Sequence, residues 1–228
     1  MSPRQLVDSA EGKLDTVVVC DHNEIKGALE AREIAVRENR KLIVELGIEF
    51  STQFGEIGAK FLSDSEAERL MALKGGSGTF GFGDLKTALN DIRGNSDSRT
   101  LVDLHHPYDV INPKRGFNLM GAIAHFPNKT MEELMAFFDF TEMNTACMHP
   151  KEIRMALDLA KTFRKPIVCS TDSHFPGQIG RYFTETHCPD ARDGILFDQQ
   201  LKLPSPEEVN HWLSVWYRLR SKIRKTLG

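Results

Sequence analysis

The segment Pro166-Ile-Val-Cys-Ser-Thr-Asp-Ser-His-Phe-Pro-Gly-Gln-Ile-Gly180 begins as an apolar run and ends abruptly in Asp172 and His174. The apolar run is typical of a buried strand. Because side chains alternate along an extended chain, Asp172 and His174 are expected to leave the strand end on the same face, with Ser173 on the other. A carboxylate beside an imidazole suits a divalent ion such as zinc, manganese or iron. The alternative is a capped strand end with a hydrogen-bonded Asp-His pair.

Four other predicted strands end in residue types that bind metals. The strand-like runs over residues 16–20, 41–52, 100–104 and 138–144 carry, at or just after their ends, His22, Glu49, His106 and Glu142. Parallel strands of a barrel bring their carboxyl ends to one face, which is where such folds build their sites. The repeated pattern therefore predicts a metal site made of strand ends.

Predicted helices separate most of these strands. Helical composition and periodicity cover residues 2–14, 24–39, 64–73, 84–93, 151–163 and 205–227. A further short strand is expected over residues 55–62. The alternation of strand and helix predicts parallel strands with right-handed crossovers, in either a barrel or an open sheet.

The composition is that of one soluble globular domain. The 228 residues suffice for a single sizeable core, so one domain is expected over residues 1–228. A charged content of 27% with a formal net charge of -3 argues against bulk attraction to nucleic acid or membranes and favours a small partner. The sequence contains no bilayer-length apolar run and no signal-peptide core at its start. The cysteines show no paired spacing, which indicates reduced thiols and a cytoplasmic location.

A glycine-rich segment imitates a nucleotide-binding motif. Gly76-Ser-Gly-Thr-Phe-Gly81 matches the dinucleotide fingerprint letter for letter. That fingerprint functions only where a strand turns directly into the helix that receives the pyrophosphate. Since residues 64–73 before it are predicted to be helical, we expect a loop here rather than a cofactor site.

Five motifs follow one another in the order of a known superfamily. They are Val19-Cys-Asp-His-Asn23, Gly47-Ile-Glu-Phe-Ser-Thr52, His106-Pro-Tyr-Asp109, Glu142-Met-Asn-Thr-Ala146 and Ser170-Thr-Asp-Ser-His-Phe-Pro-Gly-Gln-Ile-Gly180. In these motifs, over most of residues 2–186, the chain resembles the PHP (polymerase and histidinol phosphatase) superfamily. The resemblance implies an α/β fold, a distorted (β/α)7 TIM-like barrel, commonly with two or three divalent metals, that hydrolyses phosphate esters.

The resemblance also implies a set of metal ligands. Carried over onto matching positions, the ligands are His22, Glu49, His106, Asp172 and His174, with Glu49 as the bridging carboxylate. Glu142 and Asn144 match a motif but no firm ligand position. His105 is the structural alternative to His106, which is preferred because the family's ligand directly precedes a proline.

Two departures from the family pattern affect the expected site. The family opens with a strand that bears His-x-His, and this chain has no such segment. Many members also carry a histidine after the Glu motif, where this chain has Glu56-Ile-Gly-Ala59, and no histidine lies between residues 23 and 104. We therefore expect Met1 to be an internal methionine, with roughly 15 to 20 further residues in the native protein that carry the first strand. Without that strand, one edge of the strand over residues 16–20 is expected to be unpaired.

The expected function is metal-dependent hydrolysis of a phosphate ester by activated water. Glu49 and His174 are the candidate catalytic residues at the metals, and Arg115 and Arg181 are the candidates for positioning the phosphate. The substrate is expected to be a nucleotide, a sugar phosphate or a short oligonucleotide; the sequence indicates no oligomeric state. The alternatives are exposed arginines without a role and a non-catalytic barrel that serves as a binding or scaffold module.

Overall fold

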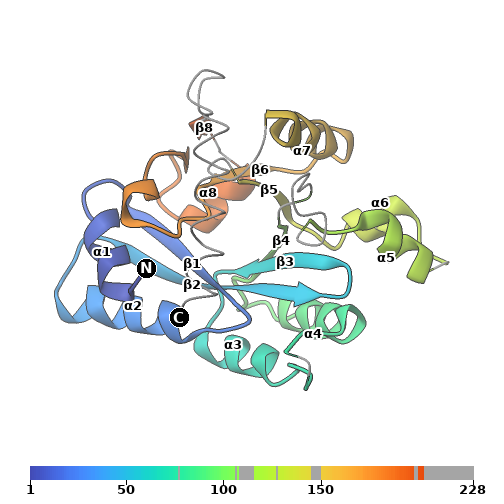
Figure 1. Ribbon diagram of the computed structural model, residues 1–228, viewed down its shortest axis with the longest axis horizontal. Coiled ribbons are helices and arrows are strands. Elements are labelled where there is room, and N and C mark those ends of the chain that lie inside the picture. The colour runs from blue at the N-terminus through green and yellow to red at the C-terminus, as the bar shows by residue number, and fades with distance from the viewer. Residues whose placement is uncertain are drawn as a thin grey trace, which may run out of the picture.

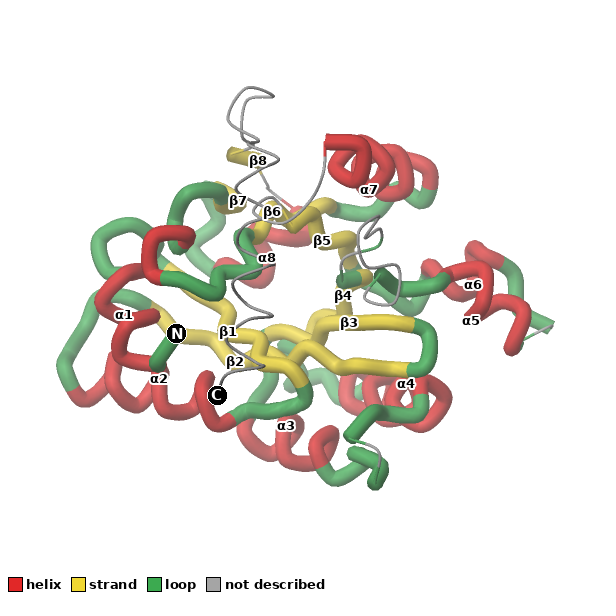
Figure 2. The backbone as a smooth tube through the Cα atoms, in the orientation of Figure 1, coloured by secondary structure: helices red, strands yellow, loops and turns green. Residues whose placement is uncertain are grey.

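The computed structural model describes residues 1–76, 78–105, 107, 116–126, 128–144, 150–197 and 200–202. Its centre is a six-stranded sheet in which neighbours along the chain are also neighbours in space. The strands are β1 (Thr16–His22), β2 (Ile43–Thr52), β3 (Gly55–Lys60), β4 (Leu101–Leu104), β5 (Phe140–Asn144) and β6 (Ile167–Ser170). Figure 2 shows that the sheet curls into a half-barrel. The closed seven-stranded barrel expected from the resemblance is not confirmed by the described strands.

Helices surround the curled sheet, most of them on its outer side (Figure 1). They are α1 (Pro3–Ala10), α2 (Lys26–Arg37), α3 (Asp64–Met71), α4 (Phe82–Arg93), α5 (Leu119–His125), α6 (Met131–Met135), α7 (Pro150–Thr162) and α8 (Ala191–Phe197). A 3-10 turn (Pro176–Gln178) and a hairpin of β7 (Phe183–Glu185) with β8 (Gln200–Lys202) complete the described elements. The predicted helix over residues 205–227 lies outside them.

The strand directions correct one prediction. β1 and β2 are parallel, as are β4, β5 and β6, but β3 is antiparallel to both of its neighbours. Only two residues separate Thr52 from Gly55, which suffices for a hairpin but not for the crossover that parallel strands need. The carboxyl ends of the other five strands and the amino end of β3 therefore meet at one edge, which we call the site edge.

The alternation of side chains along β2 separates a core face from a polar face. Val44, Leu46, Ile48 and Phe50 are buried in the main apolar core together with residues of α2, α3 and α4. The residues between them point to the concave side of the sheet because side chains alternate along a strand. Glu49 is therefore held inside the half-barrel by the burial of its own neighbours.

The far end of the concave side is closed by a second apolar cluster. It contains Phe61, Leu101, Phe140, Val168 and Ile195, so α8 packs against the inside of the sheet. The sequence patterns did not predict α8, a helix of only seven residues that contains a glycine. The sheet therefore has an apolar cluster on its concave side as well as on its outer side.

The described cysteines agree with the prediction of reduced thiols. Cys20, Cys169 and Cys188 are free thiols, and Cys147 lies outside the described residues. In the part of the chain that the structure describes, no helix is both long enough and apolar enough to cross a membrane.

The N-terminus of α3 offers a test of a local stabilising interaction. Ser63 accepts a hydrogen bond from the backbone of Glu66, and the Glu66 side chain reaches back to the Ser63 backbone at 2.7 Å. Replacing such a capping serine by alanine typically costs about 1 kcal/mol. We expect Ser63→Ala to lower the Tm by roughly 2–4 °C in a thermal melt. An unchanged Tm would contradict the role of this cap.

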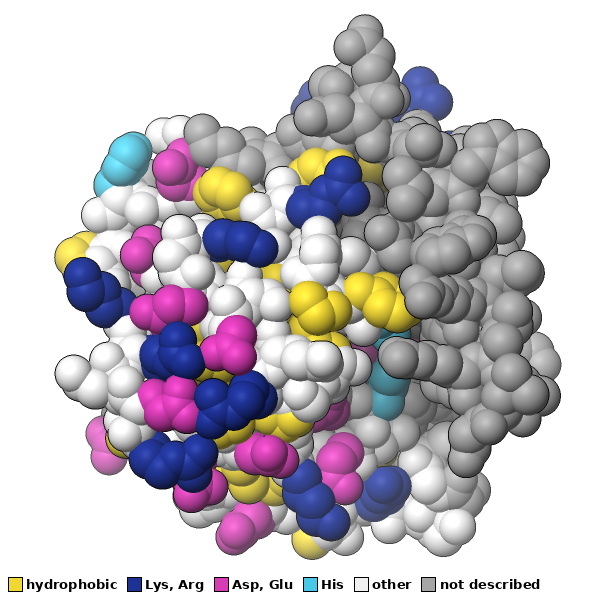
Figure 3. Space-filling view, turned by 60° about the vertical axis from the view of Figure 1, so that its left-hand side comes forward, with side chains coloured by type: hydrophobic (Ala, Val, Ile, Leu, Met, Phe, Trp, Pro, Cys, Tyr) yellow, Lys and Arg dark blue, Asp and Glu magenta, His cyan; other side chains and the backbone are white. Residues whose placement is uncertain are grey.

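Acidic and basic side chains are interspersed on the face that carries α1 and α2 (Figure 3). Glu38 accepts hydrogen bonds there from Arg4 at 3.2 Å and from Arg40 at 2.9 Å. These bonds, Arg4 first, lower the pKa of Glu38 to about 2. A lowered pKa means that the pairing stabilises the fold above the ordinary glutamate pKa of 4.5 and that this contribution is lost as the pH falls through about 2.

We expect Arg4→Ala to raise the pKa of Glu38 because the strongest hydrogen bond to its carboxylate is removed. An NMR titration of the Glu38 side chain measures the change. Arg37→Ala is the matched control, since its guanidinium lies 3.9 Å from Glu38 and makes no comparably close contact. Equal pKa values in the Arg4→Ala variant and the unmodified protein would contradict the assignment.

Candidate metal centre

Six side chains of types that can bind metals gather in two groups at the site edge. The first group is His22, Glu49 and Glu56, and the second is Asp103, His105 and Glu142; within each group, one ligand-type atom per residue lies within 4.8 Å of the others. They come from β1, β2, β3, β4 and β5, with His105 directly after β4. Of the predicted strand-end residues, His22, Glu49 and Glu142 are thus brought together at one edge of the sheet.

The first group is formed across the junction of β1, β2 and β3. His22 pairs in register with Glu49, and its Nδ1 lies 3.2 Å from Glu49 Oε2 and 3.7 Å from Glu56 Oε1. The His22 side chain is 39% exposed, whereas that of Glu49 is 3% exposed. His22 thus stands at the opening of the site and Glu49 at its interior.

The second group is centred on His105. Nδ1 of His105 lies 2.8 Å from Asp103 Oδ2 and 2.5 Å from Glu142 Oε2. Nε2 of the same ring lies 3.5 Å from Glu49 Oε1. Since the other oxygen of Glu49 faces His22, Glu49 lies between the two groups, as a bridging carboxylate must.

The electrostatics of the second group follow from burial among acids. Burial by itself lowers the pKa of His105, but the charges of Glu142, Glu49 and Asp103 outweigh it and hold the pKa well above its usual value. Burial likewise opposes the charge on Lys60, and the contact with Asp103 reverses that effect and raises its pKa. The concentration of carboxylates therefore favours cations in this site.

Asp172 and His174 lie next to each other, but not for the predicted reason. β6 ends at Ser170, and Asp172 has a φ of 42°, so the chain is no longer extended where these side chains leave it. His174 Nδ1 lies 2.8 Å from the backbone oxygen of Asp172 and 3.5 Å from its Oδ1. The turn is held by Gln178, which accepts a hydrogen bond from the His174 backbone. The alternation argument was wrong beyond Ser170, although the two residues do meet.

The remaining predicted site residues are placed only in part. His106 and Arg115 lie outside the described residues. Arg181 is exposed, and its guanidinium lies 5.9 Å from the ring centre of Tyr182. Its role as a phosphate-binding residue stays a prediction.

Sequence patterns missed Glu56, Asp103 and Lys60. Glu56 is the second residue of β3, and a parallel strand would have placed it at the edge opposite the site. The antiparallel hairpin brings it beside His22 instead. Asp103 and Lys60 lie inside short strands that are buried along their whole length, where the sequence alone suggests only core residues. The signal that could have identified Asp103 and Lys60 is the presence of a charged residue within an apolar run.

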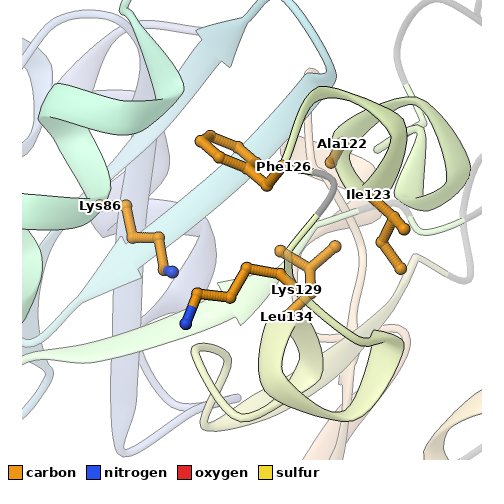
Figure 4. A pocket seen from close by; sticks show the side chains of 6 residues that line it. All are labelled: Lys86, Ala122, Ile123, Phe126, Lys129 and Leu134. Atoms are coloured by element: carbon orange, nitrogen blue, oxygen red, sulfur yellow. The ribbon is translucent and has the colours of Figure 1, made fainter.

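The donor set fits divalent metal ions. Each group combines carboxylate oxygens with an imidazole nitrogen, the ligand types that zinc, manganese and iron accept. A hollow away from these groups, lined by Lys86, Ala122, Ile123, Phe126, Lys129 and Leu134, lies among α4, α5 and α6 (Figure 4). Its lining contains neither a carboxylate nor an imidazole, so it does not compete as a metal site.

The fold and the site together define a class of protein: an α/β half-barrel with carboxylate and imidazole ligands at its strand ends. Residues 150–197 match the family model described as PHP-associated. This match agrees with the resemblance to the PHP superfamily that the sequence motifs indicated. No curated protein sequence matches the chain.

Solved structures share this fold at low sequence identity. PsfC from Pseudomonas syringae PB-5123 aligns with a TM-score of 0.63 at 16% identity, over 99% of this chain and 89% of PsfC. A two-domain protein from Bacteroides vulgatus ATCC 8482, containing a predicted PHP-like metal-dependent phosphoesterase, aligns with a TM-score of 0.51 at 18% identity. The lesion-specific endonuclease PfuEndoQ from Pyrococcus furiosus aligns with a TM-score of 0.52 at 13% identity.

The chain corresponds to only part of two of these structures. The alignment with the Bacteroides protein includes 77% of this chain and 48% of that protein. The alignment with PfuEndoQ includes 88% of this chain and 53% of PfuEndoQ. The chain thus spans about half the length of each. The common element is the half-barrel fold.

Proposed function

We propose that the chain is a metal-dependent phosphoesterase that hydrolyses a phosphate ester with an activated water molecule. The observation that carries this proposal is the position of Glu49 between the two groups, 3.2 Å from His22 and 3.5 Å from His105. Divalent ions in such a site lower the pKa of water and neutralise charge on the phosphoryl group. The full (β/α)7 barrel and the cytoplasmic location are parts of the same proposal.

The side chains divide into ligands and substrate-binding groups. We assign the metal-binding role to His22, Glu49, His106, Asp172 and His174, and we add Glu56, His105 and Glu142, which the fold brings to the same edge. Arg115 and Arg181 are assigned to the phosphate, because a guanidinium donates two parallel hydrogen bonds to phosphate oxygens. The exposed face of His22 is the side from which a substrate reaches the site.

The substrate is proposed to be a nucleotide, a sugar phosphate or a short oligonucleotide. The net charge of -3 does not favour binding of long nucleic acid by bulk attraction. The lesion-specific endonuclease among the proteins of like fold supports including short DNA substrates in any assay.

The test is metal-dependent product release. The purified chain is stripped of metal, reloaded with manganese or zinc, and assayed against a panel of nucleotides, sugar phosphates and short oligonucleotides for free phosphate and cleaved strands. We expect turnover of at least one class with metal and none with chelator. Stoichiometric metal without turnover of any of them would favour a binding or scaffold module instead, and absence of metal binding would contradict the proposal altogether.

A further inference from the structure

A buried ion pair adjoins the candidate metal centre. Lys60 Nζ lies 2.7 Å from Asp103 Oδ1, and Asp103 Oδ2 lies 2.8 Å from Nδ1 of His105. Lys60 is 5% exposed and Asp103 is fully buried. Removing two charges from water costs so much that a buried ion pair is weak evidence for a purely stabilising role. Because Asp103 also contacts His105, a histidine of the candidate metal centre, the pair points to a role in that centre.

The backbone next to the ion pair leaves room for the Asp103 carboxylate. Gly58 pairs in register with Asp103, and a Cβ atom on Gly58 would lie 2.0 Å from Asp103 Oδ1. The carboxylate therefore lies directly over the glycine. In that position its two oxygens face different partners, Lys60 on one side and His105 on the other.

We propose that Lys60 and Asp103 are positioning residues for His105. Lys60 fixes Asp103 through Oδ1, and Asp103 accepts the Nδ1 hydrogen of His105 through Oδ2, so that Nε2, the nitrogen facing Glu49, is presented to a metal. This inference rests on the proposed metal centre. Histidines that bind metals commonly donate from their other nitrogen to a carboxylate, which fixes the tautomer and the orientation of the ring.

Glu142 is the competing acceptor, because its Oε2 lies 2.5 Å from the same nitrogen. Nδ1 carries one hydrogen. Lys60 is in direct contact with Asp103 and holds that carboxylate in place. We therefore assign Asp103 as the acceptor of the Nδ1 hydrogen and Glu142 as a metal ligand. Replacing these two acids should then have different effects on the hydrogen of His105.

Metal affinity is the first readout. Calorimetric titration of the metal-free chain with manganese should show that Asp103→Asn and Lys60→Met each weaken binding by roughly 10- to 100-fold, the usual cost of losing a partner behind a metal ligand. The matched control is Asp139→Asn, which breaks the half-buried pair with Arg93, 2.9 Å apart, at the opposite edge of the sheet. The control should stay within about twofold of the unmodified affinity, by the same principle, because the contacts of Asp139 are with Arg93 and the backbone of Val102.

The second readout is the proton on His105. In the zinc-loaded protein, ¹H–¹⁵N NMR should show a hydrogen on Nδ1 and none on Nε2. Asp103→Asn should broaden or abolish the Nδ1 signal through faster exchange of its hydrogen, while Glu142→Gln should keep a sharp signal, though at a shifted position because Glu142 lies beside the ring. The opposite pattern would assign the hydrogen to Glu142 and overturn the inference.

A further variant separates effects on folding from effects on metal binding. Lys60→Met leaves the Asp103 charge buried without its partner, so the double variant Lys60→Met/Asp103→Asn, which removes both charges at nearly constant volume, is made as well. If the double variant folds and binds manganese as tightly as the unmodified chain, the positioning role is wrong. If the unmodified chain binds neither manganese nor zinc, the proposed function fails first and this inference with it.

Discussion

Replacing Glu49 by glutamine is expected to weaken metal binding and phosphate release by roughly 100-fold or more, since losing even a partner behind a ligand costs 10- to 100-fold. Each oxygen of Glu49 faces a different group, one toward His22 and the other toward His105. An amide keeps the size of the side chain but removes its charge and one of its two acceptor oxygens. The loss should therefore affect both groups at once.

The matched control for Glu49→Gln is Glu45→Gln. Glu45 lies on the same strand and, by the alternation of side chains, on the same face, but it pairs with Arg99 at 3.2 Å away from the site edge. Calorimetry with manganese and the phosphate-release assay should show a control close to the unmodified protein. Full metal affinity in Glu49→Gln would remove the bridging role from this residue.

Gly58→Ala is expected to destabilise the fold by about 1–3 kcal/mol, the usual cost of overpacking a buried position. The added methyl group would lie 2.0 Å from the buried Asp103 carboxylate, which cannot move without leaving Lys60 or His105. In a chain of this length, each kcal/mol lowers the Tm by roughly 2–4 °C. Thermal melts of the metal-free protein measure the effect.

Gly83→Ala is the control for the glycine substitution. Gly83 lies in α4, is exposed, and a Cβ atom there would meet nothing within 4 Å. Alanine in a helix should leave the Tm unchanged or raise it, because glycine loses more conformational entropy on folding. Equal melts for Gly58→Ala and the unmodified chain would show that Asp103 relaxes freely, which would weaken the positioning role inferred for it.

Local patterns in the sequence predicted most of the elements. The runs over residues 16–20 and 100–104 became β1 and β4, and the helical ranges 24–39 and 84–93 became α2 and α4, because apolar spacing depends only on neighbouring residues. The short β7, β8 and α8 were missed, since elements of a few residues carry little periodicity. The rejection of Gly76–Gly81 as a nucleotide site agrees with the helix α3 that precedes it.

The sequence by itself determined that residues of metal-binding types, including His22 and Glu49, lie near the ends of predicted strands, and its motifs indicated the PHP superfamily. Only the tertiary structure decided that β3 runs antiparallel and brings Glu56 to the site edge. Only the tertiary structure placed Lys60 against Asp103 and Asp103 against His105. The physical reason is that strand direction and register arise from hydrogen bonds between segments distant in the chain, whereas residue type and periodicity are local properties.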